Sequence, residues 1–345
     1  MKHSFGSDNH SGVHPVIMDA IVKENLNFKK SYGEDTYTLG VLNSLEESLG
    51  GDCTAVFVFN GTGANVVALQ AFVRSYESIL APKTAHINVD ECGAVEKLSQ
   101  SRIIPIECVS GKVKAEDVKL ELYGYGDQHH AQPRILSISQ PTELGTCYTT
   151  DEIKELADLM HNNGGYLHID GSRISNAAAY MNKSVKEITA DCGADALSFG
   201  GTKNGLLMGE AVVIFNNTKN AHAANSIKYI RKQTTQLFSK SRFIAAQFEA
   251  YLKDGFNIKL ATASNQMAQY LANSIKDIKE VKISQPVESN AVFAIIPKWL
   301  TEELQKKHYF YVWNENTNEV RWMCSFNTTK EDIDAFVNDI KELTK

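Results

Sequence analysis

The chain has 345 residues, of which 43% are hydrophobic and 22% are charged, and its length suits one large domain with a smaller one attached. Its formal net charge is −6, which argues against nucleic acid or an anionic membrane surface as a partner. The first residues carry no apolar run typical of a signal peptide, and no later stretch is long enough to span a bilayer. We therefore expect a cytoplasmic protein.

The N-terminal third begins with two predicted helices, which apolar spacing places at residues 15–26 and 36–49. A continuous apolar run at residues 55–59 then predicts a strand covered on both faces. This strand leads directly into residues 60–65 and a further helix that ends near Tyr76. Because a strand, a glycine turn and a helix N-terminus in succession present free backbone amides, we expect a phosphate group to bind here. The predicted contacts are Gly61, Thr62 and Gly63.

Strands and helices then alternate as far as residue 215. Apolar runs predict strands at residues 78–80, 85–89, 103–107, 134–141, 166–170, 196–199 and 211–215. A clear helix is predicted at residues 151–161. This alternation predicts an α/β fold, with a mostly parallel sheet and helices on both faces. Ligands of such sheets bind at the carboxyl ends of the strands.

The C-terminal part has a different organisation. A long helical region is predicted at residues 221–251 and is broken at Asp254-Gly255. Short strands then alternate with helices, at residues 291–296, 309–313 and 320–326, and a final helix starts near residue 330. This pattern predicts a small α+β domain. We expect a large domain at residues 1–250 and a small C-terminal domain at residues 251–345.

Lys203 and Asp170 follow two neighbouring strands of the predicted sheet. Lys203 comes after two glycines at a strand end, where it can form a Schiff base with an aldehyde cofactor. A surface lysine in a turn is the alternative. Asp170 ends the preceding strand, and a carboxylate there can keep the ring nitrogen of pyridoxal phosphate protonated. Because both side chains would project from one sheet edge, the pair favours the cofactor interpretation.

Eight stretches in chain order resemble the threonine aldolase branch of the fold-type I pyridoxal-phosphate enzymes, and most of all the low-specificity L-threonine aldolases. They are residues 7–9, 32–35, 60–65, 85–86, 90–94, 168–173, 198–205 and 321–325. The resemblance implies the fold of that class and retro-aldol cleavage of L-threonine and L-allo-threonine to glycine and acetaldehyde. Another β-eliminating lyase is the alternative within the same cofactor class. A protein that binds the cofactor or an amino acid without turnover has no need of Lys203.

The resemblance also implies which residues bind the cofactor. Lys203 carries it, Asp170 holds its ring nitrogen, and His86 stacks on its ring, where an imidazole can also transfer protons. The phosphate lies on Gly61, Thr62 and Gly63, with the Thr202 hydroxyl as a further donor. Arg173 is a cofactor contact as well as a substrate contact.

The substrate carboxylate would be held by Ser7, Arg173 and Arg321, again by resemblance. Two arginines suit this role, because a planar guanidinium fixes both the position and the plane of a carboxylate. Arg321 begins an apolar run, so an edge-strand arginine that faces solvent is the alternative for that residue.

His129 matches a family histidine near the substrate hydroxyl, but spacing does not decide between His129 and His130. The group that takes the hydroxyl proton also stays open. The two adjacent histidines do not predict a metal site, because no cysteine or acid stands at a suitable spacing.

The resemblance implies a homo-oligomer, a dimer or a tetramer built from dimers, with active sites at the subunit boundary. Tyr32 and residues 232–240 would then reach a neighbour's cofactor. Many family members have a glycine-rich segment ending in Met-Arg-Gln, where this chain has Thr235-Gln-Leu-Phe-Ser-Lys240. Lys232 and Lys240 are therefore only candidates for the basic group that a partner directs at the phosphate.

Six scattered cysteines form no Cys-x-x-Cys pair and predict reduced thiols in a reducing compartment. Cys92 and Cys324 lie in the stretches named above. Small buried filler is favoured over a catalytic thiol for both residues.

Overall fold

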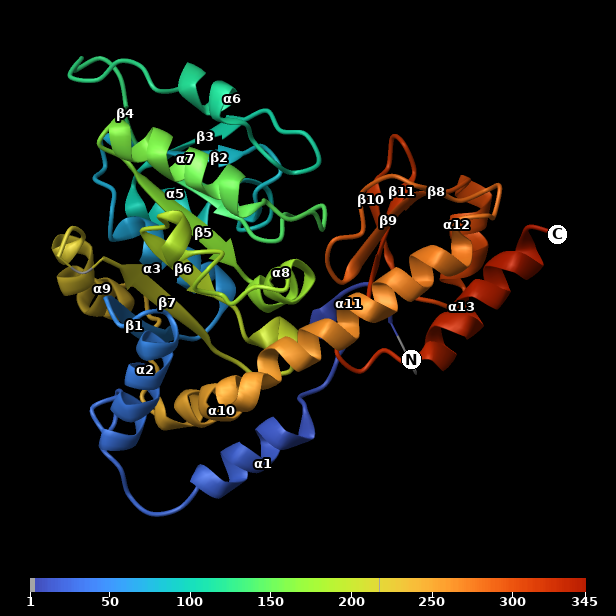
Figure 1. Ribbon diagram of the computed structural model, residues 1–345, viewed down its shortest axis with the longest axis horizontal. Helices are drawn as coiled ribbons and strands as arrows, with labels where there is room; N and C mark the ends of the chain where they lie inside the picture. The colour runs from blue at the N-terminus through green and yellow to red at the C-terminus, as the bar shows by residue number, and fades with distance from the viewer. Residues whose placement is uncertain (1–3, 217) are drawn as a thin grey trace.

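A seven-stranded sheet organises the larger part of the computed structural model, which describes residues 4–216 and 218–345 (Figure 1). The strands lie side by side in the order β1-β7-β6-β5-β4-β2-β3. Their bounds are β1 (Cys53–Val58), β2 (Glu77–Pro82), β3 (Arg102–Ile106), β4 (Gln132–Ser139), β5 (Tyr166–Gly171), β6 (Ala196–Phe199) and β7 (Glu210–Phe215). Because β7 is antiparallel to both neighbours and the other pairs are parallel, the sheet is mostly parallel, as predicted.

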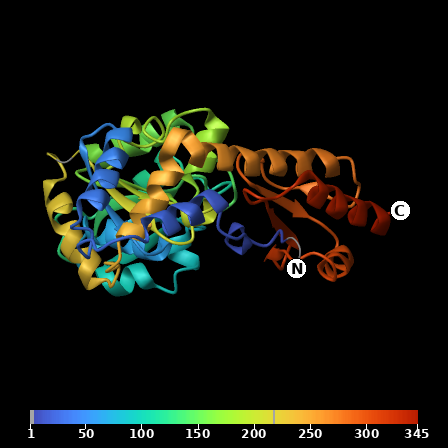
Figure 2. The same cartoon turned by 90° about the horizontal axis from the view of Figure 1, so that it is seen from below.

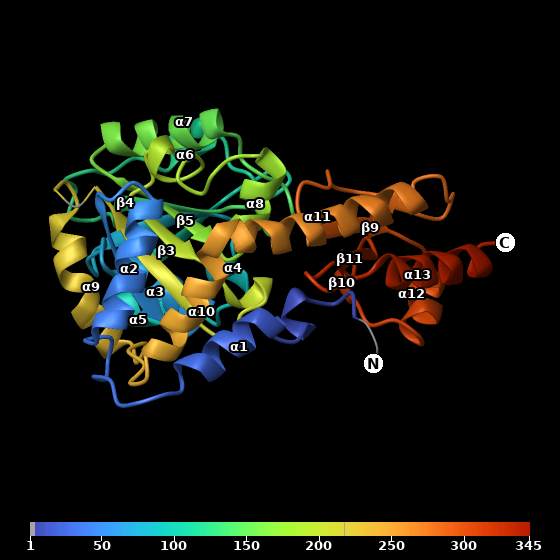
Figure 3. The same cartoon turned by 60° about the horizontal axis from the view of Figure 1, so that its bottom comes forward.

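Helices cover both faces of this sheet (Figure 3). On β5, Leu167 and Ile169 pack into the core that contains α7, α8 and α10, whereas Tyr166 packs on the opposite face with α3 and α9. The helix bounds are α1 (Pro15–Glu24), α2 (Thr36–Ser48), α3 (Gly61–Gln70), α4 (His86–Val89), α5 (Ala94–Ser99), α6 (Ala115–Leu120), α7 (Thr150–Asn162), α8 (Ile174–Met181), α9 (Ala221–Gln233) and α10 (Arg242–Leu252).

His168 is a buried polar residue within β5. One ring nitrogen is hydrogen-bonded to Ser137 on β4 (2.9 Å) and the other to Ser198 on β6 (3.0 Å). Burial lowers the pKa of His168 to about 4, so the ring is neutral at pH 7. It ties together three strands whose carboxyl ends point toward the same edge.

A second sheet, of four antiparallel strands in the order β10-β11-β9-β8, forms the smaller body. Its elements are β8 (Lys282–Ile283), β9 (Ala291–Ile295), α12 (Lys298–Gln305), β10 (Tyr311–Asn314), β11 (Glu319–Met323) and α13 (Lys330–Leu343). The α/β fold with a smaller α+β body is thus confirmed.

Helix α11 (Phe256–Ile275) runs from the larger body into the smaller one (Figure 2, orange). Its Leu260 packs in the larger core, and its Leu271 packs in the smaller. Phe5 also packs in the smaller core, where its ring lies 4.6 Å from that of Phe336. The chain therefore passes between the two cores twice, once after Phe5 and once along α11. The division into domains at residue 250 stays a prediction.

Residues 85–89 were predicted as a strand, but the structure corrects this to helix α4. Ile87 and Val89 favour a strand by propensity. However, the Glu143 carboxylate accepts the His86 N–H (3.0 Å) at the helix start, where negative charge is stabilising. A distant contact thus overrides the local preference.

The helical region predicted at residues 221–251 is also divided in two, since α9 ends at Gln233 and α10 begins at Arg242. Thr235 between them has a left-handed backbone (φ 62°), which no helix interior allows. The two-residue strand β8 was not predicted, because two residues are too few for a periodic pattern. Within residues 4–216 and 218–345, no helix has both the length and the apolar character that crossing a membrane requires.

Candidate active site

The carboxyl ends of the strands bring Lys203 to the edge of a cavity of about 410 Å³. After β6 the chain turns through Gly200 and Gly201, and Lys203 lies in the following 3-10 helix (Thr202–Asn204). Burial, followed by the charge of Arg173, lowers the pKa of Lys203. A surface lysine would not show this shift, so the turn does not simply expose Lys203 to solvent. A lowered pKa leaves more of the amine unprotonated and nucleophilic.

Asp170 at the end of β5 is held by three hydrogen bonds. Ser172 donates its N–H (3.0 Å) and its hydroxyl (2.6 Å) to Oδ1, and Asn65 donates to Oδ2 (2.8 Å). Burial by itself would raise the pKa of Asp170, but the Ser172 hydroxyl, the Lys203 charge and Asn65 outweigh it, so the pKa lies below its usual value. Asp170 is thus an ionised and oriented carboxylate.

His86 begins α4 and belongs to a polar chain that reaches Asp170. Its Nδ1 donates to Glu91 Oε1 (2.8 Å), and Asn65 donates to that same oxygen (2.8 Å) as well as to Asp170. The bond to Glu91 raises the pKa of His86. Sequence reasoning missed Asn65 and Glu91 as site residues, although both lie inside the motif stretches at 60–65 and 90–94.

The N-terminus of α3 forms one wall of the cavity. Asn60 caps the helix, its Oδ1 accepting the N–H of Gly63 (2.8 Å). The N–H groups of Gly61 and Thr62 have no acceptor in the described part of the chain. These two amides and the positive end of the helix dipole form a donor set that fits a phosphate group. The Thr202 hydroxyl, the further predicted donor, lies 3.5 Å from the Gly209 carbonyl oxygen and also lines the cavity.

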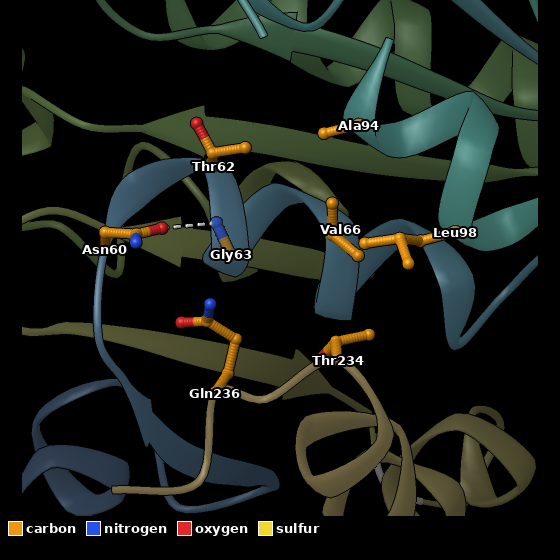
Figure 4. Close-up of a pocket in the computed structure, with 8 residues that line it drawn as sticks. All are labelled: Asn60, Thr62, Gly63, Val66, Ala94, Leu98, Thr234 and Gln236. Carbon is orange, nitrogen blue, oxygen red and sulfur yellow. Dashed lines mark hydrogen bonds between the residues drawn. The ribbon is translucent and has the colours of Figure 1, made fainter. Parts of the chain in front are cut away.

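Gly63 and Gly200 both lie too close to a neighbour to accept a side chain, but the neighbouring atoms differ in kind. A Cβ atom on Gly63 would lie 2.1 Å from Gln236 Cδ. Figure 4 shows this side chain beside Gly63, in a cavity of about 220 Å³. A Cβ atom on Gly200 would lie 2.2 Å from the backbone oxygen of Ser172. The Gln236 side chain is flexible and can move away from Gly63. The Ser172 backbone beside Gly200 cannot move without shifting the site residues next to it.

Gly200→Ala should therefore destabilise the protein more than Gly63→Ala. We expect Gly200→Ala to lower the free energy of unfolding by about 1–3 kcal/mol, the usual cost of overpacking. Gly63→Ala should cost less, and adding Gln236→Ala in the same chain should recover most of that loss. Urea unfolding followed by circular dichroism measures all three. If the two glycine variants lose equal free energy of unfolding, the expected difference between a backbone and a side-chain neighbour is wrong.

The N-terminal segment brings together the three residues predicted to hold a carboxylate. Asp8 accepts two hydrogen bonds from Arg173, from Nε to Oδ2 (2.6 Å) and from Nη2 to Oδ1 (2.9 Å). Ser7 is next to Asp8 in the chain, and its side chain accepts the N–H of Asn9 (3.2 Å). The carbonyl oxygen of Gly6 accepts Nη2 of Arg321 (2.9 Å). Residues 6–8 therefore link one arginine of each body.

Arg321 does not face solvent as an edge-strand arginine would. Its guanidinium lies 5.6 Å from the ring centre of Tyr311, its cross-strand neighbour, and 4.9 Å from that of Trp313. Burial, together with repulsion from Arg173, lowers the pKa of Arg321 to about 10. Its buried Nε has no hydrogen-bond partner among the described residues. A desolvated guanidinium with an unpaired N–H group is suited to bind an anion.

His129 and His130 do not reach this cavity from their own chain. Both are exposed and precede β4 at its amino end, while Ser139 at the carboxyl end of β4 lies beside Lys203. At ~3.3 Å per residue, the strand separates its two ends by about 23 Å. In the described part of the chain, no group of three or more His, Cys, Asp or Glu residues is arranged to hold a metal ion.

Tyr32 and Lys232 lie close together on one chain. The Lys232 ammonium is 5.2 Å from the ring centre of Tyr32, and the Tyr32 N–H bonds to the Ser239 carbonyl (2.8 Å). Lys240 is exposed nearby in sequence. Of the motif cysteines, Cys324 is buried, as expected for filler. Cys92 is exposed, so the filler interpretation is wrong for it.

Comparison with known proteins agrees with this arrangement. The beta-eliminating lyase family model matches residues 4–298. A low-specificity L-threonine aldolase from Pseudomonas sp. (strain NCIMB 10558) is 35% identical over 341 residues, 99% of this chain and 97% of that protein. The enzyme of the same description from Pseudomonas aeruginosa is 35% identical over 98% of this chain and 96% of its own length. A solved threonine aldolase structure from Leishmania major superimposes with a TM-score of 0.93 at 27% identity, covering 99% of this chain and all of that one. The chain therefore belongs to the beta-eliminating lyase family and, within it, to the low-specificity L-threonine aldolases.

Proposed function

We propose that this protein cleaves L-threonine and L-allo-threonine to glycine and acetaldehyde, with pyridoxal 5'-phosphate as its cofactor. The observation that carries the proposal is that Lys203, with its lowered pKa, lines the same cavity as the free amides of the α3 N-terminus. Asp170 lies beside Lys203, in a smaller cavity that the lysine also lines. A volume of about 410 Å³ is within the usual range for small-molecule sites. When bound, the cofactor supplies an electron sink for the electron pair of the broken Cα–Cβ bond.

Each polar group of the cavity then has a role toward the cofactor. Lys203 would bind its aldehyde carbon covalently. The low pKa of Asp170 keeps this carboxylate charged, so it would hold the ring nitrogen protonated. His86 would lie on the ring, and Arg173 would contact it. The phosphate would be held by the free amides of Gly61 and Thr62 and by the Thr202 hydroxyl. Gly63, the other predicted contact, already donates its N–H to Asn60 and lines the neighbouring cavity.

The substrate carboxylate would bind where the two bodies meet, on Ser7, Arg173 and Arg321. Asp8 already occupies the Nε and Nη2 edge of Arg173, which leaves Nη1 and the second Nη2 hydrogen for a ligand. Arg321 has an unpaired Nε. We infer that the two guanidinium groups together turn the substrate, so that its Cα–Cβ bond is set for cleavage.

Arg321→Lys keeps the positive charge but replaces the planar guanidinium, with its paired N–H donors, by a single ammonium group. The carboxylate can then swing, and orientation is needed chiefly in the transition state. We expect kcat/KM for L-threonine to fall by about 10- to 150-fold, the equivalent of roughly 1.5–3 kcal/mol for a charge-assisted bond. Most of the loss should appear in kcat. Steady-state kinetics measure it, and the cofactor absorption spectrum, which should not change, is the control. Wild-type kcat/KM would remove Arg321 from the site.

The proposed activity is tested by mixing the purified protein and cofactor with L-threonine, L-allo-threonine or D-threonine and measuring acetaldehyde. We expect release from the two L isomers alone. Pyruvate or 2-oxobutyrate formation from other β-substituted amino acids, without acetaldehyde from threonine, would instead support another β-eliminating lyase.

We also propose a homo-oligomer, at least a dimer and by family resemblance a tetramer, with active sites between subunits. Exposed apolar side chains after and along α1 support this: Val22, Leu26 and Phe28 are at least 65% exposed. In such an assembly Tyr32 and Lys232 would serve a neighbour's cofactor, and His129 would approach the substrate hydroxyl only from another subunit. A fully active monomer in sedimentation experiments would contradict the proposal. A cytoplasmic location and a domain boundary near residue 250 stand as further proposals.

A further inference from the structure

Glu143 follows β4 and has one carboxylate oxygen fully engaged and one unpaired. Oε1 accepts the His86 N–H (3.0 Å) and the Ser139 hydroxyl (2.5 Å). Oε2 is buried and has no hydrogen-bond partner within residues 4–216 and 218–345. A buried carboxylate oxygen without a partner is costly, so this position calls for a functional explanation.

A small cavity of about 30 Å³ lies beside Glu143. Its polar lining includes Ser139, Asp170, Arg173 and Lys203. This volume suits one water molecule, and the lining offers the two to four partners that a buried water needs. His86, Ser172 and Lys203 line both this cavity and the larger cofactor cavity. A water held here would lie between Glu143 and the groups proposed to hold the substrate.

Resting on the function proposed above, we propose that Glu143 is the acid–base residue of the reaction and exchanges protons with the substrate through one water in this cavity. The β-hydroxyl O–H bond breaks, its proton passes to the water, and a proton of the water passes to Oε2. The O–H electron pair forms the aldehyde C=O bond, while the pair of the broken Cα–Cβ bond stays with Cα. The proton then returns through the water to Cα, which gives glycine and restores the carboxylate.

The surroundings of Glu143 suit this role. Burial, with a contribution from the charge of Asp170, raises the pKa of Glu143 against the opposing bonds from the Ser139 hydroxyl, its own backbone N–H and the His86 N–H. This brings the carboxyl closer to the range in which a general base is effective. The other charged groups that face the cavity are Arg173, Lys203 and the His86 ring.

The neighbouring groups are less suited to take the proton. The hydrogen bond to Glu91 raises the pKa of His86, so its ring is more often protonated. Asp170 accepts three hydrogen bonds. Glu91 also has an unpaired Oε2, but it lines the larger cavity and not the small one shared with Arg173. Glu91 is therefore the acid to compare with Glu143.

The test is Glu143→Gln, since an amide keeps an oxygen to accept the His86 and Ser139 bonds but cannot take up a proton. We expect kcat for L-threonine to fall by about 10²- to 10⁴-fold, the usual effect of losing a general base, with KM little changed. The fall of kcat on the acidic side of the pH profile should disappear in this variant. If Glu143 only caps α4, Glu143→Gln will keep wild-type kcat and pH profile, and the proposal is wrong. It is equally wrong if Glu91→Gln removes this fall and Glu143→Gln does not.

A second measurement uses the cofactor-free protein. The infrared difference spectrum between wild type and Glu143→Gln, recorded across the pH range, should show the carbonyl band of a protonated carboxyl that persists above the usual glutamate range. A Glu143 that ionises at or below an ordinary pKa overturns the proposal. If wild-type protein releases no acetaldehyde from L-threonine, the proposed function itself is wrong and this proposal falls with it.

Discussion

Lys203→Ala should lower kcat/KM for L-threonine by at least about 10²- to 10⁴-fold, since losing the covalent attachment should cost no less than losing one acid–base group. The variant loses the only lysine that lines the cofactor cavity among the described residues, and with it the covalent attachment of the cofactor. Acetaldehyde release measures the rate. Borohydride reduction followed by peptide mass spectrometry measures the attachment, and it should find the cofactor on residue 203 in wild type and on no lysine in the variant.

Lys228→Ala is the matched control, because Lys228 is an exposed lysine on α9. It should retain both the rate and the adduct. A reducible adduct at another lysine in Lys203→Ala would show that Lys203 has been assigned the wrong role.

Asp8→Ala should lower the free energy of unfolding by about 3–5 kcal/mol at pH 7, because it leaves the Arg173 guanidinium in a partly buried site without its counter-charge. Arg321 lies close enough to repel it. Urea unfolding at fixed protein concentration measures the change. The control is Asn290→Ala, which removes the hydrogen bonds of Asn290 to Asp8 Oδ2 (3.1 Å) and to the Cys324 carbonyl (2.7 Å) but leaves the counter-charge in place. It should cost less, about 1–3 kcal/mol.

The contribution of Asp8 to stability should also depend on pH. Burial alone would raise the pKa of Asp8, but the charge and hydrogen bonds of Arg173 outweigh it, so the pKa in the folded protein is lowered. A carboxyl with a lowered folded pKa stabilises the protein above its unfolded pKa of about 3.9 and loses that effect as the pH falls through the folded value. The difference between wild type and Asp8→Ala should therefore shrink in acid. A difference that stays constant down to about pH 2 would contradict the ion pair.

The sequence was informative wherever the chemistry follows a strand end. Asp170 lies at the end of a buried strand, and Gly61 and Lys203 follow the ends of two others within four residues. The sheet therefore brings them together, and this could be predicted without knowing any long-range contact. The contacts that complete the site join residues far apart in the chain. Asp8 and Arg173 are separated by 165 positions, and His86 and Glu143 by 57. No local pattern encodes such pairs.

For the fold, helix α4 is likewise an element that no local pattern predicts. Its residues alternate as a strand does, and the carboxylate that caps the helix lies on another segment. The aromatic pair around Arg321 could not be predicted either, since it depends on the register of β10 against β11.

The N-terminal segment joins parts of the protein that are synthesised far apart in time. Phe5 donates its N–H to the Tyr309 carbonyl (2.9 Å) and accepts the N–H of Met323 (2.8 Å), and these bonds hold the segment in which Asp8 pairs with Arg173. During translation the ribosome has made Phe5 and Asp8 long before Met323 exists. A nascent chain that ends before Arg321 would lack one of the two guanidinium groups proposed for the substrate carboxylate, as well as the Met323 N–H that bonds to the Phe5 carbonyl. With the carboxylate site proposed above, substrate binding would be complete only after the smaller body has been made, and unfinished chains would be catalytically silent.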